Sequence, residues 1–354
     1  MNDMTDIRPA AVFLAGGLTI MVSACAPVTA KTLPSRAAAA TDSPATPSPT
    51  PSGTAPTTQL APMTALVSAP SADVVWVLAD TGLFVSEDRG GTWQQRSLPP
   101  SPAPKAEISF VDDHQGWFAS GGVPETQCNG AGTEIWQTSD GARSWQLITS
   151  VDYEHLGGGG IGIRQCKEGL SFLDTTHGFL GAWDPNSRPT VYRTADGGRN
   201  WTGSTLPDPP GFVTLGAGDA LRAGLVKRFG ATLLVPAWGM QPDAQMETEY
   251  IFRSLDGGAS WTYLATAGAG VDNVTLVTAS RWLKLSNSQA SFESTDGGKT
   301  WHAYTTDYQV ISDDPSVFSF PDSQVGYGTA NGEIRRTIDG GTHWVLIISL
   351  GSPR

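Results

Sequence analysis

Ser294-Thr-Asp296-Gly-Gly298-Lys-Thr-Trp301 is a stretch that recurs six times in the chain with small changes. Its shared pattern is Ser or Thr, any residue, Asp, any residue, Gly, two further residues and Trp. Successive Asp residues are 52, 56, 60, 40 and 43 positions apart, and they are Asp88, Asp140, Asp196, Asp256, Asp296 and Asp339. Such intervals match one four-stranded blade each. We therefore predict an all-β fold, a six-bladed β-propeller of four-stranded antiparallel blades.

Each residue type in this repeat suits a tight hairpin turn. The Asp can accept hydrogen bonds from backbone N–H groups of the turn, and the Ser or Thr before it can bond the carboxylate. The Gly supplies positive φ without steric cost, although the second copy has Ala142 there and keeps Gly141. The Trp starts the outer strand and packs its ring between blades. We interpret the six aspartates as structural residues between the third and fourth strands.

A second motif, Ser-Phe-x-Asp followed by Gly and an aromatic residue, supports the propeller. Its three copies begin at Ser109, Ser171 and Ser319, and the spacing from Phe to Gly is six each time. Each copy predicts an inner strand, a tight turn and the start of the next strand.

The repeat resembles the Asp-box, or bacterial neuraminidase repeat, and both motifs together resemble the photosystem II assembly/stability factor-like propellers. The resemblance covers about residues 65 to 350. It implies that the boxes are structural and lie away from the ligand face.

Seven blades are the alternative count, because the interval before Asp256 could hold a blade without a box. We favour six, because Leu221 to Leu234 and Tyr250 to Ser254 already supply the strands of one blade.

The N-terminal region differs in composition from the repeats. Ala10 to Val22 is an apolar run, too short for a membrane span and typical of a signal-peptide core. It ends in Val22-Ser23-Ala24-Cys25, which resembles the bacterial lipobox, so Cys25 would become the diacylglyceryl-modified N-terminus. The leader carries two acidic residues and only Arg8 as a cation, which departs from the pattern. An ordinary secretory signal is the alternative.

These features divide the chain into three parts. We predict a lipoprotein signal peptide over residues 1–24, a disordered tether rich in Pro, Thr, Ser and Ala over 25–64, and the propeller over 65–354. The predicted location is extracytoplasmic, with the protein lipid-anchored to the bacterial cell membrane.

Two cysteines remain besides Cys25, and an even pair in an exported protein suggests a disulfide. In the expected register, Cys128 lies between the second and third strands of blade two. Cys166 lies in the connection from blade two to blade three, and both loops open on the same face. We predict that Cys128 and Cys166 are bridged, with two free thiols as the alternative.

The face opposite the boxes, here called the loop face, is the expected binding face. It takes the long segments 122–133, 152–168, 182–189, 202–219, 238–249 and 302–315, and binding residues usually lie on loops held by a rigid scaffold. The candidate ligand-binding residues are Tyr153, His155, Arg164, Trp183, Asp184, Trp238, Met240, Asp243, Tyr304 and Tyr308. Each also has a structural interpretation; Trp183 and Trp238, for example, could simply plug the central channel.

Composition and motifs favour a non-catalytic protein. The net charge of −12 argues against nucleic acid as a partner, because phosphate binding needs a basic surface. Sialidases, which share the boxes, need three arginines around a carboxylate and carry a Phe/Tyr-Arg-Ile-Pro signature, which this chain lacks. Arg193, Arg253 and Arg336 instead share one repeat position, three residues before a box Asp.

The remaining expectations concern cofactors and partners. The five histidines show no ligand spacing, so we expect neither a metal nor another cofactor. The predicted function is a binding or assembly module for a protein or glycan ligand on the loop face, touching the membrane only through its lipid. A sialidase-like glycoside hydrolase is the alternative.

Overall fold

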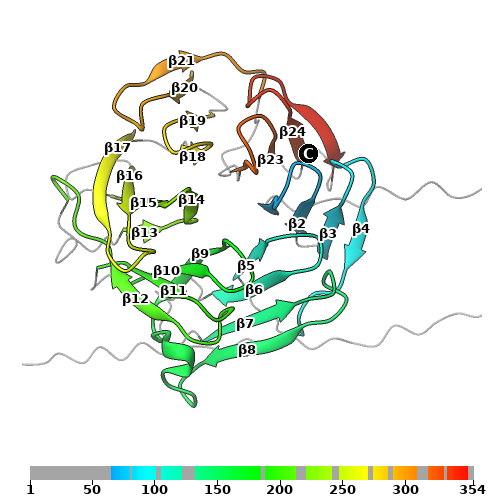
Figure 1. The fold of residues 1–354 in the computed structure, drawn as a ribbon, viewed down its shortest axis with the longest axis vertical. Coiled ribbons are helices and arrows are strands. Elements are labelled where there is room, and N and C mark those ends of the chain that lie inside the picture. The colour runs from blue at the N-terminus through cyan, green and yellow to red at the C-terminus, as the bar shows by residue number, and fades with distance from the viewer. Residues whose placement is uncertain are drawn as a thin grey trace, which may run out of the picture. The chain divides into compact units, whose positions relative to one another are not determined.

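The computed structural model describes residues 65–79, 82–100, 105–121, 132–184, 188–212, 221–240, 247–269, 274–285, 290–308, 318–330 and 333–349. These residues form six antiparallel sheets arranged radially around a central opening (Figure 1). The predicted six-bladed, all-β propeller is confirmed, and the described ranges contain no seventh sheet. The signal peptide, the tether and Cys25 lie outside them. No helix of the described part is long and apolar enough to span a membrane.

The first three blades each have four strands, ordered from the innermost outward. Blade 1 consists of β1 (Ala65–Ser68), β2 (Val75–Ala79), β3 (Gly82–Ser86) and β4 (Gln94–Arg96). Blade 2 consists of β5 (Lys105–Phe110), β6 (Gly116–Gly121), β7 (Thr133–Thr138) and β8 (Gln146–Val151). The short 3-10 helix η2 (Gly158–Gly160) precedes blade 3, which consists of β9 (Cys166–Phe172), β10 (Gly178–Trp183), β11 (Thr190–Thr194) and β12 (Thr202–Thr205).

Blade 4 departs from this pattern because its inner strand is broken. It consists of β13 (Arg222–Ala223), β14 (Lys227–Phe229), β15 (Thr232–Met240), β16 (Glu247–Ser254) and β17 (Thr262–Ala269), and both β13 and β14 pair with β15. Blade 5 consists of β18 (Val274–Leu276), β19 (Trp282–Lys284), β20 (Ser291–Ser294) and β21 (His302–Tyr304). Blade 6 consists of β22 (Phe318–Ser319), β23 (Gly326–Ala330), β24 (Glu333–Thr337) and β25 (Val345–Ser349).

Every Asp-box joins the third strand of a blade to its outer strand, as predicted. In the box of blade 5, Asp296 Oδ1 accepts the N–H groups of Lys299 and Thr300 at 3.0 and 2.9 Å. Ser294 Oγ donates to the same carboxylate and accepts the N–H of Gly298, whose φ is +81°. These bonds hold the pKa of Asp296 down to about 2, with the side-chain bond from Thr300 as the largest cause. The boxes are therefore self-contained turns.

The Ser-Phe-x-Asp motif also has a structural role at each position, and the predicted strand, turn and strand are confirmed. In blade 2, the Phe110 ring stacks on Trp76 of blade 1 at 3.7 Å between centroids. Asp112 Oδ1 accepts the N–H groups of His114 and Gln115 and so closes the turn after β5. Gly116 then starts β6, and a Cβ there would lie 2.2 Å from the Phe110 ring, which explains the glycine.

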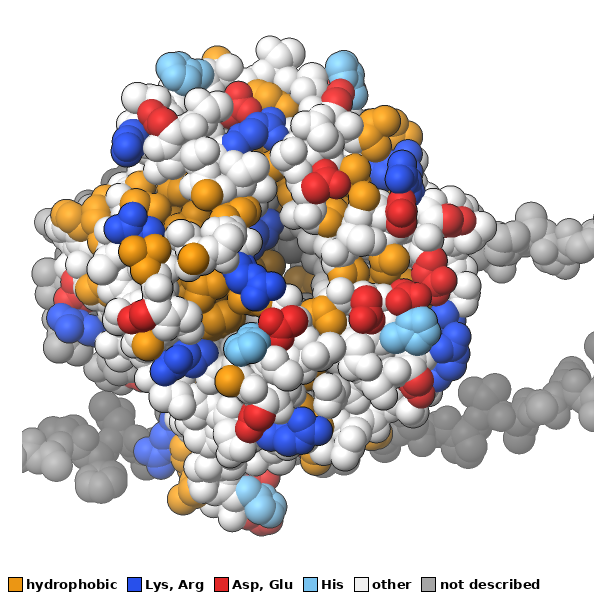
Figure 2. Space-filling view, viewed as in Figure 1, with side chains coloured by type: hydrophobic (Ala, Val, Ile, Leu, Met, Phe, Trp, Pro, Cys, Tyr) orange, Lys and Arg blue, Asp and Glu red, His pale blue; other side chains and the backbone are white. Residues whose placement is uncertain are grey.

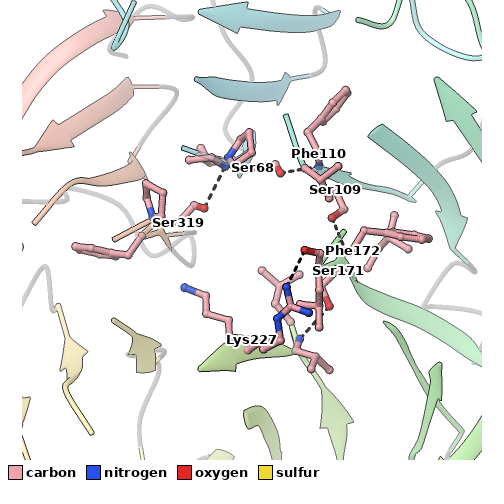
Figure 3. A pocket seen from close by; sticks show the side chains of 18 of the residues that line it. Ser68, Ser109, Phe110, Ser171, Phe172, Lys227 and Ser319 are labelled. Carbon is pink, nitrogen blue, oxygen red and sulfur yellow. Dashed lines mark hydrogen bonds between the residues drawn. The ribbon is translucent and has the colours of Figure 1, made fainter. Parts of the chain in front are cut away.

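The three serines of the motif, together with Ser68 at the end of β1, link neighbouring blades around the channel. Four Oγ atoms each accept a backbone N–H from the next blade, and Figure 3 shows them spaced around the lumen. These bonds, here called the serine belt, run from Ala69 to Ser319, Phe110 to Ser68, Phe172 to Ser109 and Val226 to Ser171. In blade 4, Leu225 takes the serine position, and these four bonds leave the joints between blades 4 and 5 and between blades 5 and 6 outside the belt.

The ring closes between blade 1 and blade 6, whose strands come from opposite ends of the propeller segment. No strand is exchanged between these two sheets. Instead, Val67, Val77 and Ile334 belong to one buried cluster that spans the joint. Tyr327 donates its hydroxyl to the Ala72 carbonyl at 2.6 Å, and the first bond of the serine belt crosses the same joint. Apolar packing and side-chain bonds therefore complete the ring.

Candidate functional site

The loop-face end of the central channel forms a small cavity of about 190 Å³. The inner strands all begin at this end, because each is followed by the turn on the box face. Its wall is largely apolar and includes Leu66, Leu276 and Phe318. Charged groups and an indole interrupt this wall, and they are Glu107, Glu168, Glu249, Lys227 and Trp238.

Two tryptophans and an arginine form a cluster at this opening, here called the Trp–Arg cluster. The guanidinium carbon of Arg222 lies 5.9 Å from the Trp183 ring centroid and 5.6 Å from that of Trp238. Arg222 pairs with Trp238 across β13 and β15, while Trp183 ends β10 in the neighbouring blade. Glu247 forms an ion pair with Arg222. Both indoles stay partly exposed, so the cluster presents a pre-ordered aromatic and charged surface.

Among the carboxyl groups around this cavity, Glu249 has the most strongly shifted pKa. It is 6% exposed on β16, and its Oε2 accepts the N–H of Val274 in blade 5 at 2.7 Å. Burial raises the pKa of Glu249 to about 8, and the Val274 bond and the charge of Lys284 oppose this shift only in part. Glu249 therefore carries a proton at neutral pH.

The connection from blade 2 to blade 3, residues 152–165, forms the adjoining rim. Lys167 is buried and donates to the carbonyls of Gly162 and Gln165 at 2.9 and 2.8 Å. Burial lowers the pKa of Lys167 to about 7, while the Asp184 carboxylate opposes this shift. The Tyr192 hydroxyl accepts the N–H of Gly162 and donates to Gln165. Side chains of blade 3 thus order this rim.

The other candidates of this rim lie on its outer surface. Tyr153 is 51% exposed, and the guanidinium carbon of Arg164 lies 5.6 Å from its ring centroid. His155 Nδ1 lies 2.9 Å from the Asp152 carboxylate, which also accepts the His155 backbone N–H at 2.7 Å. These residues form a patch on the rim, distinct from the Trp–Arg cluster.

Tyr304 does not lie in a loop as expected, because residues 302–304 form the outer strand β21, and Tyr308, which follows this strand, is buried. Tyr304 reaches the box of blade 6, where its hydroxyl donates to the Gly340 carbonyl at 3.2 Å. Tyr308 is 2% exposed and donates to the Thr329 carbonyl. Both are packing residues here, and Tyr308 is not accessible to a ligand.

Two further predictions fall partly or wholly outside the described residues. Met240 ends β15, but its side chain lies outside them, as does Asp243. Cys166 begins β9 and is 1% exposed, while Cys128 lies outside the described residues. The Cys128–Cys166 disulfide therefore stays a prediction.

The described residues show no group of arginines suited to binding a sialic acid carboxylate. Arg193, Arg253 and Arg336 lie at equivalent positions on third strands, close to the boxes. Arg336 donates to the Arg89 carbonyl in the box of blade 1, so it serves the joint between blades. Asp112, Asp113 and His114 could approach one ion, but they lie in the exposed turn that Asp112 closes.

Sequence reasoning missed Arg222, Lys227, Glu168 and Glu249. The sequence did contain a signal for Glu168, which is a charged residue three positions before the motif serine Ser171. A residue at that place on an inner strand faces either the channel or a joint between blades. No comparable signal marked Arg222 and Lys227, because the inner strand of blade 4 lacks the Ser-Phe-x-Asp motif.

Comparison with known proteins identifies the repeat and the fold. The BNR/Asp-box repeat model matches residues 292–303. No curated protein matches the chain significantly by sequence. A protein of unknown function from Dyadobacter fermentans superposes with a TM-score of 0.51 and 11% identity, covering 82% of this chain and 93% of that one. An α-L-arabinofuranosidase from Fusarium graminearum, in complex with an iminosugar inhibitor, has a TM-score of 0.50 and 10% identity, covering 77% and 92%.

YCF48 bound to D1 peptide is a third similar structure. Its TM-score is 0.41 at 16% identity, covering 80% of this chain and 94% of that one. At these identities the likenesses concern the fold alone. The chain is a six-bladed propeller built on BNR/Asp-box turns.

Proposed function

We propose that the chain is a membrane-anchored, extracytoplasmic binding module that holds a protein ligand on its loop face. The Trp–Arg cluster is the observation that supports this proposal. Trp and Arg are the residue types that contribute most to protein interfaces. Because Arg222 lies against both indoles, these large side chains are already ordered before binding, which lowers the entropic cost of association.

A protein ligand fits this surface better than a sugar ring does. A glycan would stack on an open indole face, but the Arg222 guanidinium already lies over the rings of Trp183 and Trp238. The partly exposed indoles and the Arg222–Glu247 ion pair offer apolar contact beside charged groups. That combination is typical of the centre and rim of a protein interface.

Site-specific photocrosslinking in the native membrane tests the proposal. A photoreactive phenylalanine analogue at position 183 should give one discrete crosslinked species, and the same analogue at Ile338 should not. Ile338 is a matched control because it is 62% exposed in the box of blade 6. Equal crosslinking from both positions, or none from position 183, would refute a loop-face protein ligand. Binding to a glycan array that is lost in Trp238→Ala would indicate the glycan ligand instead.

Anchoring is a separate part of the proposal and rests on the sequence Val22-Ser23-Ala24-Cys25. Mass spectrometry of the mature protein should find diacylglyceryl-modified Cys25 at the N-terminus. An unmodified N-terminus at another residue would contradict the anchor and leave the binding surface unaffected.

A glycoside hydrolase is the second candidate, and Glu249 is the observation that favours it. A general acid must be protonated at the working pH, and the raised pKa of Glu249 meets this need. Glu107 and Glu168 line the same cavity and could supply the second carboxylate. Turnover of aryl glycosides by the full chain that disappears in Glu249→Gln would establish the enzyme. Absence of turnover across α- and β-linked substrates supports the binding module.

A further inference from the structure

The box-face half of the channel is a second cavity, distinct from the loop-face opening. Its volume is about 460 Å³, and it is lined by the ends of the inner strands and the turns that follow them. The molecular surface is hollowed at the centre of the ring, and basic and acidic side chains lie at its margin (Figure 2). Figure 3 shows the serine belt and Lys227 around this cavity, with the ammonium group of Lys227 directed into the lumen.

The serine belt leaves hydrogen-bond donors directed at this cavity. Each of the four Oγ atoms accepts a backbone N–H, yet among the described residues none of the four hydroxyl groups donates to a protein acceptor. Ser109 and Ser171 are only 6% and 9% exposed, so bulk water does not surround them. A serine hydroxyl has one donor proton, and here each proton is free to turn toward the lumen.

Lys227 adds a positive charge where the belt is interrupted. Its Nζ donates to the Leu276 carbonyl of blade 5 at 3.1 Å, which leaves two N–H donors of the ammonium. Within the described residues, no carboxylate oxygen lies within ion-pair distance of Nζ, and burial lowers the pKa of Lys227 to about 8. An uncompensated ammonium in a partly enclosed site gains from a bound anion.

The remaining charged groups of the channel are unevenly placed. Arg228 also lines the box-face cavity, but its guanidinium lies 3.6 Å from the Asp174 carboxylate. Asp322 is the acidic residue of this lining, and its Oδ1 already accepts two N–H groups of its own turn. The glutamates Glu107, Glu168 and Glu249 line the opposite, loop-face cavity, which Lys227 also reaches.

We propose that the box-face cavity binds a small oxyanion, a carboxylate or a phosphate, between Lys227 and the hydroxyl groups of the serine belt. Several O–H donors and a cation around one lumen match the several acceptor oxygens of such a group. A neutral ligand would leave the ammonium uncompensated, and a cation would meet the like charges of Lys227 and Arg228. The proposal does not rest on the ligand proposed for the loop face, although Lys227 lines both cavities.

NMR of the full chain labelled with ¹³Cε-lysine tests the proposal directly. The probes are sulfate, which represents a phosphate group, and acetate, which represents a carboxylate; sodium chloride at equal ionic strength is the control. If sulfate or acetate binds, the titration midpoint of Lys227 should rise by at least about one pH unit in the presence of that anion. Such a rise means that the anion binds the charged amine at least tenfold more tightly than the neutral amine. A response to sulfate alone assigns the site to phosphates, and a response to acetate alone assigns it to carboxylates.

Two variants separate this site from general anion effects. The rise in Tm that the active probe causes should be lost in Lys227→Met and kept in Lys299→Met, an exposed lysine of the blade 5 box. Ser171→Ala should weaken probe binding about tenfold or less, because it removes one donor. A Lys227 midpoint that is equal in sulfate, acetate and chloride would overturn the proposal. So would an undiminished Tm rise in Lys227→Met.

Discussion

Removal of one hydroxyl from the serine belt should destabilise the whole propeller. Ser109→Ala deletes the acceptor of the Phe172 N–H, a buried bond of 2.7 Å between residues 63 positions apart. An unsatisfied buried N–H costs about 1–3 kcal/mol, and the methyl group of alanine recovers little of this. Ser319→Ala deletes a longer, partly buried bond of 3.1 Å to the Ala69 N–H, which water in the channel can replace. We therefore expect losses of about 2 kcal/mol for Ser109→Ala and about 1 kcal/mol or less for Ser319→Ala.

Urea unfolding of the full chain, followed by tryptophan fluorescence, measures both losses. Amide hydrogen exchange adds a local test, because the Phe172 N–H should exchange faster in Ser109→Ala and remain protected in Ser319→Ala. Equal losses in the two variants would show that burial of the bond does not determine its contribution. Full protection of the Phe172 amide in Ser109→Ala would refute the inference that the serines join the blades.

Three further predictions follow from the same structure. Gly116→Ala should unfold or strongly destabilise the protein in thermal melts, because the new Cβ would lie 2.2 Å from the Phe110 ring. Gly230→Ala is the control: its Cβ would have no atom within 4 Å, so the substitution should lower the free energy of unfolding by only about 1 kcal/mol, for its positive φ. The box aspartates have lowered pKa values, so the stability that they contribute is present above about pH 4 and should be lost as pH falls toward 2 in acid titrations followed by circular dichroism. Glu249 has a raised pKa, so stability should fall between about pH 4.5 and 8, and Glu249→Gln should remove this slope from urea midpoints measured across that range.

The fold could be predicted because its most repeated element is local. A box contains nearly all its own hydrogen-bond partners within eight residues, as Asp296 and Ser294 show. Its residue pattern is therefore visible in sequence, whatever surrounds it. The same holds for the turn after β5, where Asp112 caps its own loop. Counting such turns was enough to count the blades.

The candidate binding surface could be predicted only in part because it is made by non-local contacts. Trp183 and Trp238 were identified as candidates from their position after second strands, but no pattern in the sequence indicated that Arg222 lies against both. Tyr304 was misplaced because β21 begins directly after the box Trp, where a loop was expected. The serine belt was hidden for the same reason, since its bonds join residues of different blades.

The direction of the inner strands explains why the two ends of the channel differ. Every inner strand runs from the loop face to the box face. In blades 1, 2, 3 and 6 the last residues of the inner strand supply the serines of the belt, and in blades 2 and 3 they also form stacked pairs such as Phe172 on Trp117. Substitution there changes the joints between blades. The first residues, such as Glu107, do not take part in the belt. The loop-face end can therefore vary in charge while the box-face end preserves the ring, which is the arrangement expected of the proposed binding module on a fixed scaffold.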